Sequence, residues 1–235
     1  MEQSMEGSHI VTQICLLAGK IILQNGGETY RVEDTMIRIA AAYGFDGSQS
    51  FVTPTGLIFA IEGEYRETRL IRISERSNNL AKVSNVNDIS RRISNGELRA
   101  EEAYKLLREL DTASFNYRSA HKVLAAALAS GCFLLMAQGG LRDFLPVLLI
   151  GGLGYYFFTV VYRFIQIQFF SEFLAALFIG SLAVFAVELG LGGQLDKIII
   201  GSVIPLVPGL HITNAVRDLM AGHLVSGLSK ARKLC

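Results

Sequence analysis

Residues 144–162 read FLPVLLIGGLGYYFFTVVY, and this stretch decides the fold because it contains no charged side chain. Three further stretches, residues 123–138, 169–187 and 198–216, are also mostly apolar. An α-helix rises about 1.5 Å per residue, so about 20 residues cross the ~30 Å hydrocarbon core of a bilayer. Buried helices of a water-soluble protein would need polar faces to cover them, and these stretches have almost none. We therefore predict about four membrane-spanning helices.

The charged residues are concentrated at the other end of the chain. Most of the 22 Lys and Arg and most of the 21 Asp and Glu precede residue 119. The formal net charge of +1 gives no electrostatic reason to expect a nucleic-acid partner. The N-terminus, MEQSMEGSHI, lacks the basic and apolar regions of a cleaved signal peptide, so we expect the front half to stay in the cytosol.

The front half predicts a mixture of helices and strands. Apolar residues follow helical spacing over residues 10–23 and 29–43, with Thr29 as the predicted N-cap of the second helix. Short β-rich runs follow at residues 50–53, 57–62 and 68–73, separated by the turn sequences Pro54-Thr55-Gly56 and Glu62-Gly63-Glu64. Helical spacing returns from residue 79 to about residue 110. The predicted fold is a cytoplasmic α+β domain, residues 1–118, followed by an α-helical transmembrane domain, residues 119–235.

Basic residues flank the apolar stretches unequally. Arg118 and Lys122 precede the first stretch, Arg163 follows the second, and Arg217 and Lys230 follow the fourth. Cytoplasmic loops carry an excess of Lys and Arg. We therefore expect a multi-pass protein whose N-terminal half, Arg163 loop and C-terminal tail face the cytoplasm.

The fourth apolar stretch is interrupted by the sequence Pro205-Leu206-Val207-Pro208-Gly209. Each proline removes a backbone donor and clashes with the preceding helical turn. Unwound backbone at membrane depth is tolerated where protein or a water-filled cavity surrounds it, and such discontinuous helices form substrate sites in many transporters. Pro205, Pro208 and Gly209 are therefore candidate substrate-binding or translocation residues. The alternative is a structural kink without a site.

Polar residues follow the interruption. Asn214, Arg217 and Asp218 share one helix face by their spacing. An Arg–Asp pair beside a broken helix can bind a carboxylate or gate its path, so these three residues join the candidate site. The alternative is an ion pair that anchors the cytoplasmic end of the helix.

A second polar segment, Gly26-Gly27-Glu28-Thr29-Tyr30-Arg31-Val32-Glu33, opens the second predicted helix. Glu28, Thr29, Arg31 and Glu33 can hold a polar ligand at a helix N-terminus, or can form a capped helix in which Arg31 contacts the glutamates. The sequence contains no GxSxG, HExxH, P-loop or Rossmann motif. We therefore expect no enzymatic activity, catalytic residue, metal or cofactor.

Together, these motifs resemble the threonine/serine exporter (ThrE-like) family. The resemblance rests on the segments 27–33, 53–55, 205–209 and 214–218, which follow the family's order and spacing over nearly the whole chain. It implies a secondary transporter in the bacterial inner membrane that exports small amino acids (threonine, serine) or dicarboxylates such as succinate. It also implies the large, YjjP-like subunit of a split exporter, which requires a small YjjB-like membrane partner in a complex that we expect to be oligomeric.

Two features depart from the family pattern. His223 stands where family members tend to have an acid, and a histidine titrates near neutral pH, so a proton-linked role stays open there. Family members usually continue into a fifth membrane helix, whereas this sequence stops at Cys235, so either a naturally short protein or a truncated sequence is open at this stage.

Two other functions are open at this stage. The chain can be a membrane-anchored cytoplasmic binding or regulatory protein without transport activity, or a membrane-bound enzyme that uses the Glu28–Glu33 region. A plain anchor needs one span and no proline-rich interruption, so the sequence favours the exporter.

Overall fold

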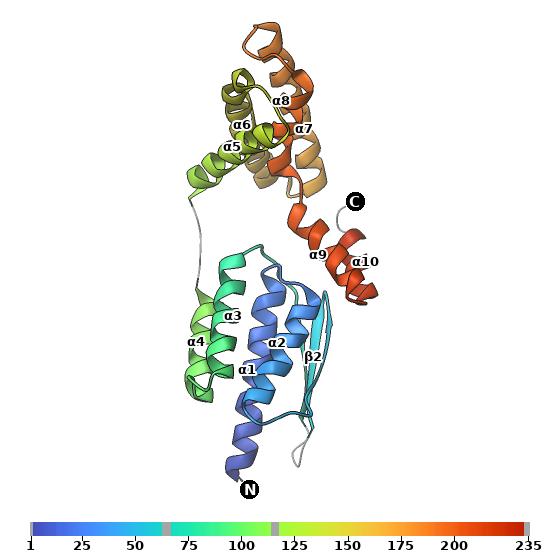
Figure 1. Cartoon of the computed structure of the whole chain (residues 1–235). Coiled ribbons are helices and arrows are strands. Elements are labelled where there is room, and N and C mark those ends of the chain that lie inside the picture. The colour runs from blue at the N-terminus through green and yellow to red at the C-terminus, as the bar shows by residue number, and fades with distance from the viewer. Residues whose placement is uncertain (1, 63–66, 114–117, 233–235) are drawn as a thin grey trace. The chain divides into compact units, whose positions relative to one another are not determined.

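The structure of the chain, a computed structural model, describes residues 2–62, 67–113 and 118–232. These residues form ten α-helices, one short 3-10 helix and three strands (Figure 1). The predicted α+β cytoplasmic domain followed by a transmembrane domain is wrong as a description of the fold, because the described residues are mainly helical and the strands form only one small sheet. The alternating runs do form strands, but each is only five or six residues long.

The chain divides into two compact units. Unit 1 contains Met1–Phe115 together with Gly209–Cys235, and unit 2 contains Asn116–Pro208. The sheet therefore does not belong to a separate N-terminal domain, because residues from the far end of the sequence complete the unit that contains it.

In unit 1 the sheet packs on the first two helices. Strands β1 (Gln49–Thr53), β2 (Gly56–Ile61) and β3 (Glu67–Arg72) pair antiparallel in the order β1-β2-β3. Their inward side chains Val52, Leu57, Phe59 and Ile61 are buried in the same core as apolar residues of α1 (Glu2–Gln24) and α2 (Thr29–Ala42). The predicted turn at residues 54–56 joins β1 to β2, whereas residues 63 and 64 of the second predicted turn lie outside the described residues.

Helices α3 (Leu80–Ser94) and α4 (Ala100–Thr112) complete the N-terminal part of unit 1. They share the core through Val83, Val86, Ile93 and Leu107. Two further helices, α9 (Gly209–Met220) and α10 (Leu224–Arg232), come from the C-terminal segment.

A tight turn joins α1 to α2 and sets the start of the second helix. Gly26 has a φ of 91°, a conformation that side chains with a Cβ rarely adopt. The Gly27 amide donates to the Ile22 carbonyl at 2.9 Å, which closes the end of α1. Glu28 is then extended, and α2 begins at Thr29.

Unit 2 contains helices α5 (Ser119–Met136), α6 (Leu141–Ile165), α7 (Gln168–Glu188) and α8 (Leu195–Val203), followed by the 3-10 helix η1 (Ile204–Leu206). By length and composition α5, α6 and α7 can each cross a membrane, and a fourth span is added if α8, η1 and α9 count as one interrupted span. In the apolar 18-residue stretch of each helix, the share of residues buried inside the protein is only 28% for α5, 28% for α6 and 22% for α7. Such apolar outer surfaces are stable in lipid rather than in water, so the chain is a multi-pass membrane protein.

Small residues allow the helices of unit 2 to approach closely. A Cβ added to Gly151 would lie 2.1 Å from the Ser130 hydroxyl oxygen, and one added to Gly154 would lie 2.4 Å from an Ile179 side-chain carbon. Asp143, which is 2% exposed, accepts a hydrogen bond from the Gly193 amide at 2.5 Å and so fixes the loop between α7 and α8.

The predicted interruption of the fourth apolar stretch is confirmed. Helix α8 ends at Val203, Pro205 lies in η1, and a new helix begins at Gly209. The boundary between the two units falls at this point, between Pro208 and Gly209.

Candidate functional site

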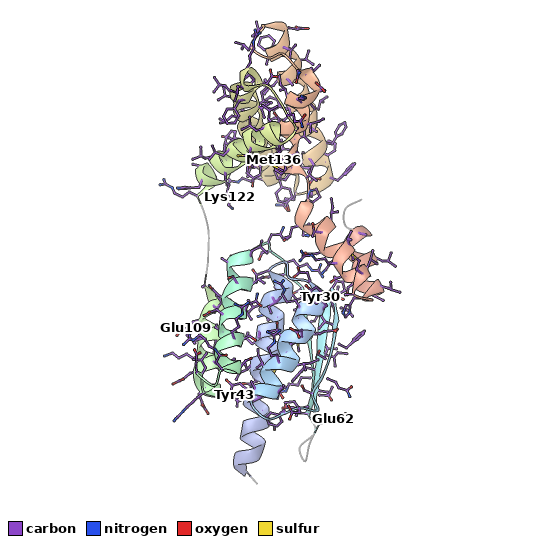
Figure 2. All side chains as sticks on the ribbon, in the orientation of Figure 1. Tyr30, Tyr43, Glu62, Glu109, Lys122 and Met136 are labelled. Atoms are coloured by element: carbon purple, nitrogen blue, oxygen red, sulfur yellow. The ribbon has the colours of Figure 1, made fainter. Side chains whose placement is uncertain are left out.

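The two polar motifs of the sequence meet in unit 1. Glu28 and Thr29 at the start of α2 contact Arg217 and Asp218 of α9, and Lys230 of α10 joins them. Arg31 pairs with Glu28 beside them, and we call these six residues the Glu28–Asp218 cluster. Figure 2 labels Tyr30, the neighbour of Thr29, near the N-terminal end of α2.

Asp218 caps the N-terminus of α2 from the other end of the sequence. Its Oδ1 accepts a hydrogen bond from the Thr29 amide at 3.0 Å, and its Oδ2 accepts one from the Thr29 hydroxyl at 2.9 Å. Thr29 was the predicted N-cap; the cap is instead Glu28, whose own side chain makes no capping hydrogen bond. The prediction failed because a carboxylate 189 residues away satisfies the helix donors that a local cap would satisfy.

Lys230 balances the charge of this buried carboxylate. Its Nζ donates to Asp218 Oδ2 at 2.6 Å and lies 3.4 Å from the Thr29 hydroxyl oxygen. The Asp218 side chain is fully buried and the Lys230 side chain is 10% exposed. A turn at Gly222, with a φ of 84°, folds α10 back on α9 and so makes this pair possible.

Glu28 lies between two guanidinium groups. Its Oε1 accepts from Arg217 at 2.6 Å, and its Oε2 lies 3.2 Å from Arg31 Nε. The Glu28 side chain is 8% exposed, whereas Arg31 is 36% and Arg217 52% exposed. An arginine carries five N–H donors, so both guanidinium groups retain donors that point away from Glu28. Asn214 adds a link beside them by donating to the Gly26 carbonyl at 2.6 Å.

Glu33 lies one turn further along α2, at the edge of the cluster. Its Oε1 accepts from the Val52 amide of β1 at 2.9 Å, and its Oε2 lies 3.6 Å from His223 Nε2. Burial raises the pKa of Glu33 above its ordinary value; the Val52 amide and His223 oppose this rise, and Asp218 adds to it. Glu33 is thus a carboxylate that takes up a proton more readily than an exposed one.

The structure brings together most of the predicted site residues, but not all of them. Glu28, Thr29, Arg31, Arg217 and Asp218 are linked directly, and Asn214 and Glu33 flank them. The remaining three candidates are not part of this network: Pro205 and Pro208 belong to unit 2, and Gly209 opens α9, where an added Cβ would meet nothing within 4 Å.

The contact between Lys230 and Asp218 was not predicted from the sequence. Lys230 was used there only as a basic residue that indicates which side of the membrane the C-terminal tail faces. Residue 218 lies four positions before Gly222 and residue 230 lies eight positions after it, and the fold-back of α10 on α9 brings the two side chains together. The glycine at position 222 was the signal that such a turn exists. Among the described residues, no group of three or more His, Cys, Asp and Glu is placed to hold a metal ion.

Chemically, the cluster is an anion-binding arrangement that the chain's own carboxylates occupy. Asp218 fills the positive end of the α2 dipole, and Glu28 fills the space between two arginines. Both positions suit a carboxylate in general, because helix N-termini and paired guanidinium groups bind such groups.

Comparisons with known proteins identify relatives over nearly the whole chain. Residues 13–233 match the family model ThrE, described as "Putative threonine/serine exporter". The chain is 25% identical over 236 residues to the "Probable succinate transporter subunit YjjP" of Klebsiella aerogenes, covering 98% of this chain and 89% of that protein. It is 24% identical over 230 residues to the protein of the same name from Escherichia coli (strain K12), covering 96% of this chain and 88% of that protein. No solved structure gives a significant match.

Proposed function

The chain belongs to the threonine/serine exporter family, and we propose that it exports small carboxylates, either dicarboxylates of the succinate type or the amino acids threonine and serine. It is a membrane transporter subunit, since its family is one of exporters and its relatives are named as transporter subunits. The observation that supports the choice of substrate class is the carboxylate-filled cluster, in which two arginines share Glu28.

The proposed role of the cluster is substrate exchange. A substrate carboxylate approaches the exposed donors of Arg217 and Arg31 and takes the place of Glu28 between them. Bidentate contact with guanidinium groups gives such a site both its affinity and its geometry. Two cations around one carboxylate repel an ammonium group, which favours the dicarboxylate over the amino acid.

The proposed setting is the bacterial inner membrane, with the N-terminal half in the cytoplasm. The excess of basic residues at Arg118, Lys122 and Arg163 supports this orientation. The relatives' names as subunits support the existence of a partner subunit. The proposed partner is a small membrane protein of the YjjB type that completes the transport path.

A reconstitution experiment tests the proposal. The chain and its partner are placed in proteoliposomes loaded with labelled succinate, threonine or serine, and efflux is followed with and without an ion gradient. We expect saturable efflux of at least one of them, with succinate favoured. The absence of flux for all three substrates under every gradient would refute the proposal, provided that both proteins are folded and inserted.

A further inference from the structure

A polar pocket lies in unit 1 beside the C-terminal end of α1. Its volume is about 340 Å³, within the ~300–1,000 Å³ that is typical of small-molecule sites. All of its lining side chains are polar or charged, and they come from α1, α3, α4 and the segment between β3 and α3. The charged ones are Lys20, Glu75, Arg76, Lys82 and Asp111. The pocket shares no residue with the Glu28–Asp218 cluster.

Hydrogen bonds within the chain hold one wall of this pocket in place. The Ser77 amide donates to the Gln24 carbonyl at 2.7 Å, and the Ser77 hydroxyl donates to Asn25 Oδ1 at 2.7 Å. The Asn79 amide donates to the Asn25 carbonyl at 3.2 Å. These bonds fasten the segment before α3 to the end of α1. A ligand therefore meets a preformed wall, which lowers the cost of ordering the chain on binding.

Two of the three cations in the pocket have no carboxylate partner. Lys20 is paired with Asp111 at 2.7 Å. Among the described residues, however, the Arg76 guanidinium donates only to the Pro54 carbonyl, and Lys82 Nζ donates only to the Asp111 carbonyl at 2.8 Å. Burial lowers the pKa of Arg76, and no described carboxylate pairs with it to offset this loss of hydration. An arginine has five N–H donors and a lysine has three, so both cations keep donors for a ligand.

The balance of charge in the pocket selects an anionic ligand. Lys20 and Asp111 neutralise each other, which leaves Arg76 and Lys82 against the exposed Glu75. A metal ion or an ammonium group would meet two cations and one carboxylate, whereas an oxyanion meets two donors of opposite charge. Guanidinium and ammonium groups bind phosphate and carboxylate oxygens through short, charge-assisted hydrogen bonds. We propose that this pocket binds a small oxyanion, with a phosphate or carboxylate group held by Arg76 and Lys82.

Titration of the full chain tests the proposal. The purified chain in detergent micelles is titrated calorimetrically with inorganic phosphate and, separately, with succinate at constant ionic strength. The two arms distinguish a phosphate ligand from a carboxylate ligand, and we expect saturable binding of at least one of them. Hydrogen exchange in the segment 75–82 should slow when that anion is present, which places the ligand at this pocket.

Charge variants separate ligand binding from a structural role. Arg76→Gln and Lys82→Met should each weaken the binding tenfold or more, because each removes a charge-assisted contact. Glu75→Gln should tighten the binding several-fold, because it removes a negative charge beside the bound anion. A loss of structure weakens binding and does not tighten it. The matched control is Lys105→Met, an exposed position on α4 outside the pocket, which should bind the anion like the wild type.

The outcome is independent of the proposed export function, because the slowed exchange at residues 75–82 should persist in Arg217→Ala. Lys82→Met also loses a contact to the last turn of α4, so the exposed Arg76→Gln decides the result if Lys82→Met does not fold. The proposal is overturned if neither anion binds saturably, if folded Arg76→Gln binds as tightly as the wild type, or if Glu75→Gln weakens the binding. It is also overturned if all of the binding depends on Arg217 rather than on Arg76, since the anion would then occupy the Glu28–Asp218 cluster.

Discussion

Removing Asp218 should destabilise the start of α2 far more than removing Lys230, although the two form one ion pair. Asp218→Ala deletes the acceptor of two Thr29 hydrogen bonds and leaves Lys230 buried without its partner. Lys230→Met deletes the short hydrogen bond to Asp218 and the longer one to Thr29, while Asp218 keeps both of its bonds to Thr29 at the positive end of a helix.

The structure gives the size of each effect. A buried charge left without its partner costs about 3–5 kcal/mol, and the lost cap adds about 0.5–2 kcal/mol. Lys230→Met leaves the buried Asp218 charge without its cation, but the two Thr29 hydrogen bonds and the positive end of α2 compensate that charge, which holds the cost to about 1.5–3 kcal/mol. The double variant Asp218→Ala with Lys230→Met removes the unpaired charge, so it should be more stable than Asp218→Ala alone.

Hydrogen exchange of the peptide that covers residues 26–32 measures the free energy of local opening at the start of α2. The measurement uses the full chain and does not require unit 2 to unfold. The order of opening free energy should be wild type, Lys230→Met, the double variant and then Asp218→Ala. The control is Lys20→Met, which breaks the Lys20–Asp111 pair (2.7 Å) elsewhere in unit 1 and should leave this peptide protected. If Lys230→Met matches Asp218→Ala, or if the double variant is the least stable, Asp218 does not act as the cap of α2.

Three further outcomes follow from the same contacts. Glu28→Gln removes the charged carboxylate that a substrate must displace between Arg31 and Arg217, so the substrate affinity of reconstituted efflux should rise about tenfold or more. An unaltered affinity contradicts the exchange role. The folded state raises the pKa of Glu33, so the folded protein holds the Glu33 proton more tightly than the unfolded chain does. The unfolding free energy of the wild type should therefore fall relative to that of Glu33→Gln as the pH rises above 4.5, the ordinary pKa of a glutamate. A difference between the two proteins that stays constant from pH 4 to 7 contradicts this sign. Gly151→Val should lower the free energy of thermal unfolding by about 1–3 kcal/mol because it forces α5 away from α6. Gly180→Val should lower it much less, because a Cβ there meets nothing within 4 Å. Equal losses of stability would show that the packing of α5 on α6 does not cause the Gly151→Val effect.

The membrane helices could be predicted from the sequence because the information is local. Long runs without charge, such as residues 144–162, have one stable environment, and α6 extends over this run in the structure. The interruption at residues 205–209 was equally local, because two prolines and a glycine fall within five residues. A single proline near the start of a helix, Pro146, leaves α6 continuous. Strand positions followed from alternation in the same way.

The cluster could not be predicted as one site, because its parts are distant in sequence. The resemblance singled out both motifs, but nothing local shows that Thr29 and Asp218 touch. The predicted fold class was wrong because the described residues are mainly helical with one small sheet, and because α9 and α10, distant in sequence, complete the unit that contains this sheet. Composition shows which residues avoid water, but it does not show which polar groups form hydrogen bonds or ion pairs with each other.

The most direct test of the exporter mechanism is the efflux of labelled succinate by Arg217→Ala, measured per folded protein in proteoliposomes that also contain the partner subunit. The Arg217 side chain is 52% exposed, so its loss should leave the unfolding temperature close to that of the wild type. A matched control is Arg108→Ala, an exposed position on α4. We predict that folded Arg217→Ala loses saturable efflux while Arg108→Ala keeps it. Wild-type efflux from folded Arg217→Ala would contradict the role of the Glu28–Asp218 cluster in carboxylate export.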